Sequence, residues 1–586
     1  MLKILKYLKP KEWGQALFSL IFIIGQVWLD LRLPEYMEKI TKLVQTPGSD
    51  IKEIWLNGGY MLLCAFGSLA SAIIVGFFAA RIAASFSQRL RSMLFNKVES
   101  FSMEEINRFS TSSLITRSTN DITQVQMLVT MALQLVVKAP ITAIWAITKI
   151  ADKGVEWTPV TAVGVLIILV MVTLLMIFVM PKFRKMQTLT DNITRVTREN
   201  LTGVRVVRAY NAEDYQENKF EETNEALTST QLYTSRAMAF MMPVMTILMS
   251  GQSLAIYWIG AYLIDAAASA MDKLNIFSNM VVFTSYSMQV IMSFMMLTMM
   301  FIMLPRASVS AKRINEVLDT VPQIKDGALT EGKPGVAGEV TFNHVSFKYP
   351  DAAEPVLDDI SFTAKKGETV AFIGSAGSGK STLINLIPRF FDATGGEVLV
   401  DGVNVRDYKL KSLLNKIGYV PQRAVLFKGT VESNVAYGEN GGNAYSADDV
   451  KRAVRIAQGA DFVEQMEGGY SADIAQGGTN VSGGQKQRLA IARAVCRKPE
   501  IYIFDDSFSA LDYKTDRVLR SVLKKETAGV TSLIVAQRIG TIMDADRIIV
   551  LDEGKVVGTG THKELLRDCA VYKEIAMSQL SEEELA

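Results

Sequence analysis

The sequence predicts a multi-domain protein in which an α-helical membrane domain of six helices is followed by an α/β domain. Its 586 residues exceed one ordinary domain, and 49% of them are hydrophobic whereas only 21% are charged. Long apolar stretches fill the first half of the chain, and short β-rich runs begin only after Pro305.

The first half contains six apolar stretches that approach or exceed the roughly 20 residues needed to cross a bilayer as a helix. They run from Trp13 to Leu29, Leu56 to Ala80, Ile122 to Ile147, Trp157 to Pro181, Ala237 to Ile264 and Ile276 to Pro305. A buried soluble helical core is the alternative, but a stretch such as VTAVGVLIILVMVTLLMIFVM has no polar face for water. We therefore expect six membrane spans.

The start of the chain, MLKILKYLKPKEW, resembles the basic region of a signal peptide. The apolar run that follows ends at Asp30, Arg32 and Pro34 rather than at a small-residue cleavage site, so we expect a retained first span. Charged side chains are costly in lipid, and we expect Asp30, Arg32 and Lys138 to face the protein interior or the membrane interface.

Basic residues predict the orientation of the spans. They are frequent from Arg81 to Asp121 and from Lys182 to Arg236, whereas DKGVEW and DAAASAMDKLN hold one lysine each. The basic connections, both termini and the second domain should therefore be cytoplasmic. This is the pattern of a multi-pass protein of the cell membrane, which in a bacterium is the inner or plasma membrane.

Composition excludes several other classes. The three cysteines, Cys64, Cys496 and Cys569, are far apart and indicate neither a disulfide framework nor a zinc site. The net charge of +2 is uninformative about partners, and no nucleic-acid-binding motif is present, so we expect no nucleic-acid partner. A Gly- and Pro-bearing stretch after Pro305 places the domain boundary near Pro322, giving domains of residues 1–321 and 322–586.

The second domain contains a phosphate-binding P-loop. In GETVAFIGSAGSGKSTLINLIPRF, an apolar strand, a glycine-rich turn and a helix follow one another, and Gly374, Gly379, Lys380 and Ser381 match G-x-x-x-x-G-K-S. Backbone N–H groups of such a loop surround phosphates, the lysine adds a positive donor, and the serine hydroxyl can bind Mg²⁺. A chance glycine-rich turn is the alternative.

About 100 residues later, NVSGGQKQRLAIARAV leads into the apolar strand IYIFDD, and the whole order resembles the ATP-binding cassette (ABC) family. The resemblance spans nearly the whole chain and implies an exporter half-transporter, with a transmembrane domain before an ABC nucleotide-binding domain. It implies ATP and Mg²⁺ as cofactors. By this resemblance Tyr349 is the adenine-stacking aromatic, Gln422 the Q-loop glutamine, and SALD the D-loop.

The resemblance also implies a set of site residues. The P-loop residues are Gly374, Ser375, Ala376, Gly377, Ser378, Gly379, Lys380, Ser381 and Thr382, and the signature residues are Ser482, Gly483, Gly484 and Gln485. Those assigned to the metal are Ser381, Gln422 and Asp505.

Two positions depart from the family pattern. Asp506 stands where the family has the glutamate that polarises the attacking water, and Gln537 stands at the switch histidine. Aspartate withdraws the carboxylate by about 1.5 Å, whereas a general base must lie within about 3 Å of its water. Glutamine can donate a hydrogen bond but cannot become cationic. These departures predict a degenerate site that holds ATP; a slow but competent site is the alternative.

The signature is intact apart from Val481 in a leucine position. In this family each ATP lies between one half's P-loop and the other half's signature. The pattern thus resembles one half of the bacterial heterodimeric multidrug exporters, whose partner half would carry the catalytic set. Gln476, where many homodimeric exporters have glutamate, is a further departure.

Two cytoplasmic segments, beginning at Phe109 and Asn200, resemble the family's coupling elements, and Arg117 with Asp121 has the i, i+4 spacing of a stiffening pair. In the last span Met288, Met292, Met295, Met299 and Met303 lie on one helical face. They suit either a cavity for varied apolar ligands or ordinary packing.

An amphipathic drug is the first expectation for the substrate, with lipid or peptide second. A different function, a nucleotide-controlled membrane sensor, stays open.

Overall fold

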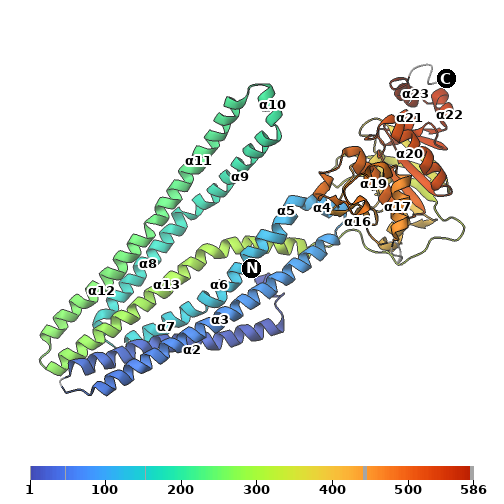
Figure 1. Ribbon diagram of the computed structural model, residues 1–586. Helices are drawn as coiled ribbons and strands as arrows, with labels where there is room; N and C mark the ends of the chain where they lie inside the picture. The colour runs from blue at the N-terminus through green and yellow to red at the C-terminus, as the bar shows by residue number, and fades with distance from the viewer. Residues whose placement is uncertain (1, 47, 152, 351, 440–444, 581–586) are drawn as a thin grey trace. The chain divides into compact units, whose positions relative to one another are not determined.

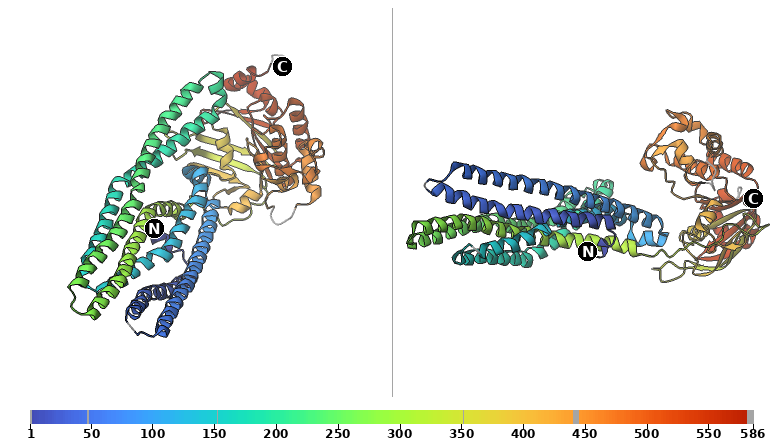
Figure 2. Two further views of the ribbon diagram at one scale, coloured as in Figure 1. Left: turned by 60° about the vertical axis from the view of Figure 1, so that its left-hand side comes forward. Right: turned by 90° about the horizontal axis from the view of Figure 1, so that it is seen from below.

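The computed structural model describes residues 2–46, 48–151, 153–350, 352–439 and 445–580. The chain forms two compact units, which Figures 1 and 2 show as a group of long helices and a mixed α/β body. The first unit comprises residues 1–99 and 110–320, and the second comprises residues 100–109 and 321–586. The short segment 100–109 thus belongs with the second unit.

The first unit is entirely helical over its described residues. Its elements are α1 (Leu2–Leu5), α2 (Pro10–Gln45), α3 (Ile51–Glu99), α5 (Thr111–Thr116), η1 (Arg117–Asp121), α6 (Ile122–Met131), η2 (Ala132–Val136), α7 (Lys138–Ala151), η3 (Val155–Trp157), α8 (Thr158–Phe178), α9 (Met180–Thr202), α10 (Val204–Ala209), α11 (Glu213–Ala239), α12 (Met241–Ala266) and α13 (Ala270–Asp319).

Six helical stretches in this unit are long and apolar enough to cross a membrane. They are Pro10–Gln45, Ile51–Glu99, Thr111–Ala151, Val155–Thr202, Glu213–Ala266 and Ala270–Thr298. Each coincides with one of the six predicted spans, so the prediction of a six-helix membrane domain is confirmed.

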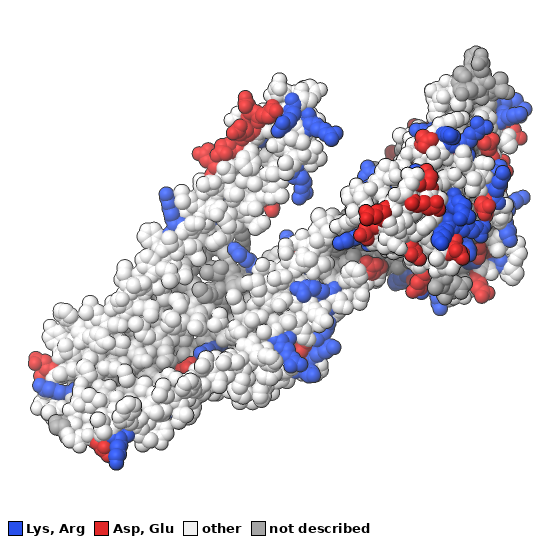
Figure 3. All heavy atoms as spheres, viewed as in Figure 1, with Lys and Arg blue, Asp and Glu red and all other residues white. Residues whose placement is uncertain are grey.

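The helices extend well beyond the predicted spans. The 49 residues of α3 correspond to about 70 Å of helix, whereas the hydrocarbon core of a bilayer is about 30 Å thick. Charged side chains are sparse along most of these helices but gather near some helix ends, for example at Glu213 and Asp214 where α11 begins (Figure 3). The ends of the longest helices therefore project into water.

Charged residues within the first spans have protein partners. Lys138 Nζ on α7 lies 3.1 Å from Asp30 Oδ2 on α2, and Ser68 Oγ on α3 donates to Asp30 Oδ1 at 2.5 Å. Arg32 pairs with Glu35 at 2.6 Å. The pair of Asp30 and Lys138 thus joins two spans.

Arg117 and Asp121 both contact α13. Arg117 donates to the Glu316 carboxylate at 3.0 Å, and Asp121 accepts from Ser310 Oγ at 2.7 Å. The segment is a π-helical turn, and its wider winding alters the faces that an α-helical spacing assumes.

The methionine face of α13 is only partly described. Met288 and Met295 are half-buried, and Met295 packs against a cluster that contains Ile168 and Leu248, whereas Met292 is exposed. The side chains of Met299 and Met303 lie outside the described residues.

The second unit contains two larger sheets. The antiparallel sheet has the order β2-β1-β4-β5, and the other sheet has the order β12-β11-β3-β10-β9-β6, in which all strands except β12 are parallel. The strands are β1 (Val340–Phe347), β2 (Leu357–Ala364), β3 (Thr369–Gly374), β4 (Gly395–Val400), β5 (Val403–Asn404), β6 (Ile417–Val420), β7 (Gly429–Thr430), β8 (Asp473–Ile474), β9 (Ile501–Asp505), β10 (Thr531–Val535), β11 (Arg547–Asp552) and β12 (Lys555–Gly560).

Helices complete the second unit around three buried apolar clusters. One cluster joins the two sheets, a second joins β9 to the helices after β6, and a third joins β3 and β11 to the last helices of the unit. The helices are α4 (Met103–Phe109), α14 (Lys380–Leu386), α15 (Leu410–Asn415), α16 (Val431–Val435), α17 (Ala447–Ile456), α18 (Ala460–Val463), η4 (Gly469–Ser471), η5 (Gln476–Gly478), α19 (Gly483–Cys496), α20 (Tyr513–Glu526), α21 (Ile539–Ile542), α22 (His562–Asp568) and α23 (Ala570–Met577).

Candidate nucleotide-binding site

Four of the predicted site segments follow four adjacent parallel strands. The P-loop follows β3, the segment of Gln537 follows β10, Asp505 ends β9 and Gln422 follows β6. Phe372, Val535 and Asp505 are register partners across three of these strands, so the following loops leave the sheet at one edge. Ligands of α/β sheets bind at this carboxyl edge.

The glycines of the P-loop lie where a side chain would not fit. A Cβ on Gly374 would lie 1.9 Å from the carbonyl oxygen of Leu551 on β11. Gly379 adopts a φ of +92°, and its Cβ would lie 2.7 Å from Leu357 Cδ2. The same Cβ on Gly379 would also lie 2.9 Å from the Val356 carbonyl oxygen, so close packing against neighbouring backbone explains both glycines without reference to a ligand.

Lys380, the first residue of α14, is folded back over the P-loop. Its Nζ donates to the carbonyl oxygens of Gly374 at 2.9 Å and Ser375 at 2.6 Å, and to Ser378 Oγ at 3.1 Å. Burial lowers the pKa of Lys380, and the negative charges of Asp506 and Asp505 oppose this shift. Three oxygen atoms of the P-loop thus hold the ammonium group.

Ser381 and Asp505 form a set of oxygen donors. Ser381 Oγ donates to Asp505 Oδ1 at 2.8 Å, joining the start of α14 to the end of β9. Burial raises the pKa of Asp505, and the hydrogen bond from Ser381 opposes this shift. A hydroxyl and a carboxylate side by side suit Mg²⁺, which binds oxygen and usually keeps water and phosphate in its shell.

Asp506 accepts hydrogen bonds from two amide side chains. Gln537 Nε2 lies 3.0 Å from Asp506 Oδ2, and Gln422 Nε2 lies 3.4 Å from the same oxygen. Asp506 is 8% exposed and adopts a φ of +45°, a region in which aspartate is one of the more tolerant residues. Burial raises the pKa of Asp506, and the hydrogen bond from Gln422 opposes the shift. The structure therefore brings together the two predicted departures.

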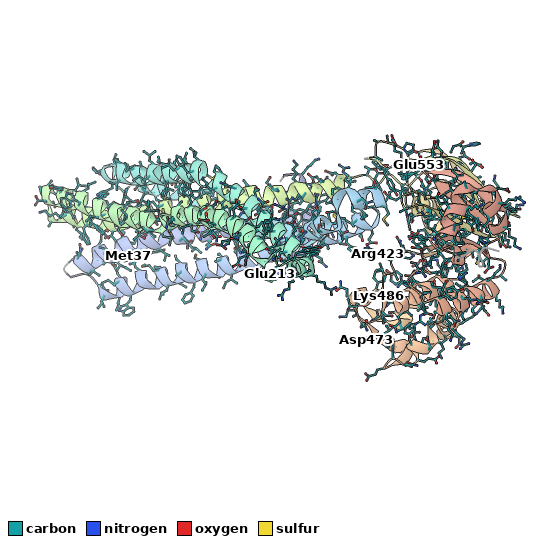
Figure 4. The ribbon with its side chains drawn as sticks, turned by 90° about the horizontal axis from the view of Figure 1, so that it is seen from above. Met37, Glu213, Arg423, Asp473, Lys486 and Glu553 are labelled. Carbon is teal, nitrogen blue, oxygen red and sulfur yellow. The ribbon has the colours of Figure 1, made fainter. Side chains whose placement is uncertain are left out.

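The signature lies at the start of α19. Ser482 is the N-cap residue: Gln485 N donates to Ser482 Oγ at 3.3 Å, and Ser482 N donates to Gln485 Oε1 at 2.8 Å. Ser482 and Gly483 are exposed, and no atom lies within 4 Å of a Cβ built on Gly483. Lys486 on α19 and Arg423 beside Gln422 lie at one edge of the unit (Figure 4).

Comparisons with known proteins match both units. Residues 16–294 match the ABC transporter transmembrane region, and residues 357–509 match the ABC transporter domain. An uncharacterised ABC transporter ATP-binding protein of Bacillus subtilis is 34% identical over 591 residues, covering 100% of this chain and 99% of that protein. The chain belongs to the ABC transporter family.

Two further relatives match most of this ABC transporter's length. An uncharacterised ABC transporter ATP-binding protein of Mycobacterium tuberculosis is 42% identical over 529 residues, which cover 89% of this chain and 87% of that protein. The ATP-dependent lipid A-core flippase of Pseudomonas fluorescens is 34% identical over 462 residues, covering 79% and 75%.

The fold matches a solved ABC exporter. A bacterial Atm1-family exporter with ATP bound superposes with a TM-score of 0.78, at 23% identity, covering 97% of this chain and 98% of the other. The predicted fold class, six membrane helices followed by an ABC nucleotide-binding domain, is therefore confirmed.

Tyr349 follows β1 and lies beside the P-loop helix of the ABC transporter domain. Its hydroxyl is 3.1 Å from Thr382 Oγ1, and its ring centroid lies 4.8 Å from that of Phe347. The ring is half-buried.

Sequence reasoning missed Gln579, which contacts the segment of Gln537. Gln579 Nε2 donates to the Gln537 carbonyl oxygen at 2.8 Å, and Ile539 N donates to Gln579 Oε1 at 2.9 Å. Gln579 follows α23 and lies 42 residues after Gln537, in no recognisable motif. Only the folded chain indicates this contact.

Proposed function

We propose that this chain is one half of a heterodimeric, ATP-driven exporter, and that its own P-loop site is degenerate. Its signature would complete the catalytic site of a homologous partner half. The relationship to the ABC transporter family supports the ATP-driven transport, and the residues at positions 506 and 537 support the asymmetry.

One observation carries this proposal most directly. The carboxylate at the position of the family's catalytic glutamate is held by Gln537 at 3.0 Å and by Gln422 at 3.4 Å. Both amide hydrogen bonds go to the same carboxylate oxygen, Oδ2, and occupy lone pairs that would otherwise accept a proton from water; the side chain is also one methylene shorter than glutamate. Gln537 supplies no positive charge for a transition state.

We assign ATP and Mg²⁺ to the site as follows. The nine P-loop residues from Gly374 to Thr382 would surround the phosphates, with Lys380 exchanging its contacts to the loop carbonyls for phosphate oxygens. Ser381, Asp505 and Gln422 would hold Mg²⁺, and Tyr349 would stack on the base. Mg²⁺ would neutralise phosphate charge there.

The signature has the features of a site for an external phosphate. Ser482 and Gly483 are exposed at the N-terminus of a helix of 14 residues, where N–H groups and the helix dipole favour anions. This surface would receive the γ-phosphate bound by the partner half.

A small amphipathic molecule is the proposed substrate, and the bilayer is its source. A groove of about 550 Å³ between α8 and the α11 and α12 segment is lined by apolar side chains and by Tyr233. Such a surface suits the apolar part of an amphiphile.

An anionic lipid is the second candidate. Lys182 Nζ lies 5.4 Å from the centroid of the Tyr233 ring, which places a cation at the lining of the apolar groove. A cation beside an apolar groove suits a negatively charged headgroup with its acyl chain. A nucleotide-controlled sensor would bind such ligands too, but would not accumulate them in sealed vesicles in the presence of ATP.

The test is to purify the full-length chain without a partner and to measure ATP–Mg²⁺ binding and phosphate release together. We expect saturable binding with negligible turnover. A control preparation of Lys380→Ala should lose most of the binding. Rapid turnover by a verified homodimer of the wild-type chain would refute the degenerate site.

A further inference from the structure

The segment that carries Gln537 has no capping side chain of its own. Helix α21 begins at Ile539, and its N-cap residue, Arg538, makes no side-chain hydrogen bond to the helix. The first N–H groups of a helix have no partner within the helix and require one from elsewhere. Here the Ile539 N–H donates to Gln579 Oε1 at 2.9 Å.

Gln579 makes a second hydrogen bond on the other side of Arg538. Its Nε2 donates to the carbonyl oxygen of Gln537 at 2.8 Å. One side-chain amide therefore uses both its donor and its acceptor on the backbone of residues 537–539. These two bonds restrict the backbone at the residue whose side chain meets Asp506 at 3.0 Å.

The location of Gln579 is itself fixed by packing. Tyr572 and Ala576 on α23 are fully buried in a cluster that also contains Ile539 and Ile542 of α21. Leu580, next to Gln579, packs against the same cluster, and its N–H donates to the Ala576 carbonyl oxygen at 2.9 Å. The apolar contacts thus hold the end of α23 against α21. Gln579 adds hydrogen bonds from this end to the backbone of residues 537 and 539.

We propose that Gln579 is a positioning residue of the nucleotide site, which holds the 537–539 segment so that Gln537 stays on Asp506. The C-terminal segment after α23 thereby controls how long this chain retains ATP. The retention part of this inference rests on the proposed function, whereas the positioning part concerns the backbone alone and holds for a hydrolysing site as well.

The positioning part is tested by hydrogen exchange in the full-length, nucleotide-free chain. Gln579→Ala should accelerate exchange in a peptide covering residues 537–542 by about 2- to 12-fold, the range for one lost intramolecular hydrogen bond. Ser578→Ala is the matched control, because Ser578 Oγ donates only to the Ile575 carbonyl oxygen among the contacts described. Unchanged exchange in Gln579→Ala would overturn the inference.

Two further substitutions each remove one of the two hydrogen bonds of Gln579 and keep the other. Gln579→Glu keeps the acceptor for Ile539 N–H and loses the donor to Gln537, whereas Gln579→Lys keeps a donor and loses the acceptor. Protection of the Ile539 amide should survive in the first and fall in the second. Equal loss of protection in both would mean that the side chain acts by packing, which overturns the assignment.

The retention part is tested by chasing bound labelled ATP with unlabelled ATP. Gln579→Ala should shorten the lifetime of bound ATP, and Gln537→Ala with Gln579→Ala should be no faster than Gln537→Ala alone. Additive effects, or an unchanged lifetime, would refute the link to the nucleotide. If the wild-type chain instead hydrolyses ATP rapidly, the proposed function fails while the exchange result still decides the positioning role.

Discussion

At position 506 the short aspartate side chain and the hydrogen bonds from its neighbours both make the carboxylate less available to an attacking water. The carboxylate of Asp506 is 8% exposed and accepts from Gln537 and Gln422. This pair stands where the family has glutamate and histidine, and the carboxylate and the amide satisfy each other. Under the proposed function, this arrangement serves to hold a nucleotide rather than to activate water.

Restoring the family residues at positions 506 and 537 tests whether this site is degenerate. In the complex with the partner half, Asp506→Glu with Gln537→His should raise ATP turnover only modestly, by less than about threefold, which corresponds to less than about 0.7 kcal/mol in the barrier. The reason is that the partner's site would already limit the cycle. Steady-state phosphate release measures the turnover rate. A many-fold rise in this rate would show that this site restrains the wild-type cycle.

Among the elements, α4 illustrates how a short helix is held by one carboxylate. Glu105 accepts from Ser102 N at 2.7 Å, which is the capping interaction of α4, and from Gln323 N at 3.0 Å. Gln323 belongs to the segment just after α13, so α4 and this segment are joined within the second unit.

Loss of this carboxylate should loosen α4. Burial alone would raise the pKa of Glu105, but hydrogen bonds from Ser102 and Gln323 outweigh it and hold the pKa below its usual range. Because the pKa of Glu105 is lower in the folded chain than in the unfolded chain, the ionised carboxylate stabilises the fold at any pH above the unfolded-state pKa. This stabilisation is lost as the pH falls through the folded-state pKa. Glu105→Ala should therefore destabilise the docking of residues 100–109 by about 1–3 kcal/mol at pH 7.

Hydrogen exchange of residues 100–109 measures this effect. The difference between Glu105→Ala and the wild type should shrink as the pH falls below about 4. Glu104→Ala is the comparison, since the Glu104 carboxylate accepts from the Gln323 side chain at 2.7 Å. A difference that does not depend on pH would contradict the role of the charged carboxylate.

In the membrane domain, the ion pair of Asp30 and Lys138 likewise joins two segments that are distant in the sequence. The two side chains are 27% and 23% exposed, and they join α2 to α7 beside the π-helical turn η2. Asp30→Asn keeps a group for Ser68 but leaves Lys138 without its counter-charge. We expect a loss of about 1–3 kcal/mol in thermal unfolding of the detergent-solubilised chain, below the value for fully buried pairs.

A double-mutant cycle distinguishes charge from shape. Asp30→Asn with Lys138→Gln should recover part of the loss, because no unpaired charge remains. The exposed pair of Lys411 and Glu439, with side chains 71% and 73% exposed, provides the control, and Glu439→Gln should leave the stability unchanged. If Lys138→Gln adds to the loss, the pair does not stabilise through its charges.

For the whole molecule, the intact signature and the altered P-loop site predict unequal effects of mutation. Ser482→Arg would place a bulky cation at the N-terminus of α19, where the partner's γ-phosphate should bind, and should abolish hydrolysis by the heterodimer. Lys380→Ala removes a phosphate contact from the slow site, and should weaken ATP retention while leaving measurable turnover.

Matched heterodimers that carry each change decide between these outcomes. Phosphate release and bound ATP are measured in the same preparations. Equal losses of turnover would make the two sites equally essential. A larger loss for Lys380→Ala would place the catalytic site on this chain.

The sequence alone was sufficient for the six spans and for the P-loop. Apolar stretches long enough to cross a bilayer have no alternative partner in water, and the P-loop glycines at 374 and 379 mark a strand, turn and helix by their local spacing. It was also sufficient to single out Asp506 and Gln537, since their positions in short motifs are visible without a structure. These signals are local in the chain.

The tertiary structure decided the contacts that join distant segments. Gln579 contacts residues 537 and 539, Glu105 contacts Gln323, and both Arg117 and Asp121 contact α13. A hydrogen bond depends on positions and directions within a few tenths of an ångström, which packing of the elements sets. Spacing along the chain contains no such information, so only the folded molecule identifies Gln579 as a neighbour of the nucleotide site.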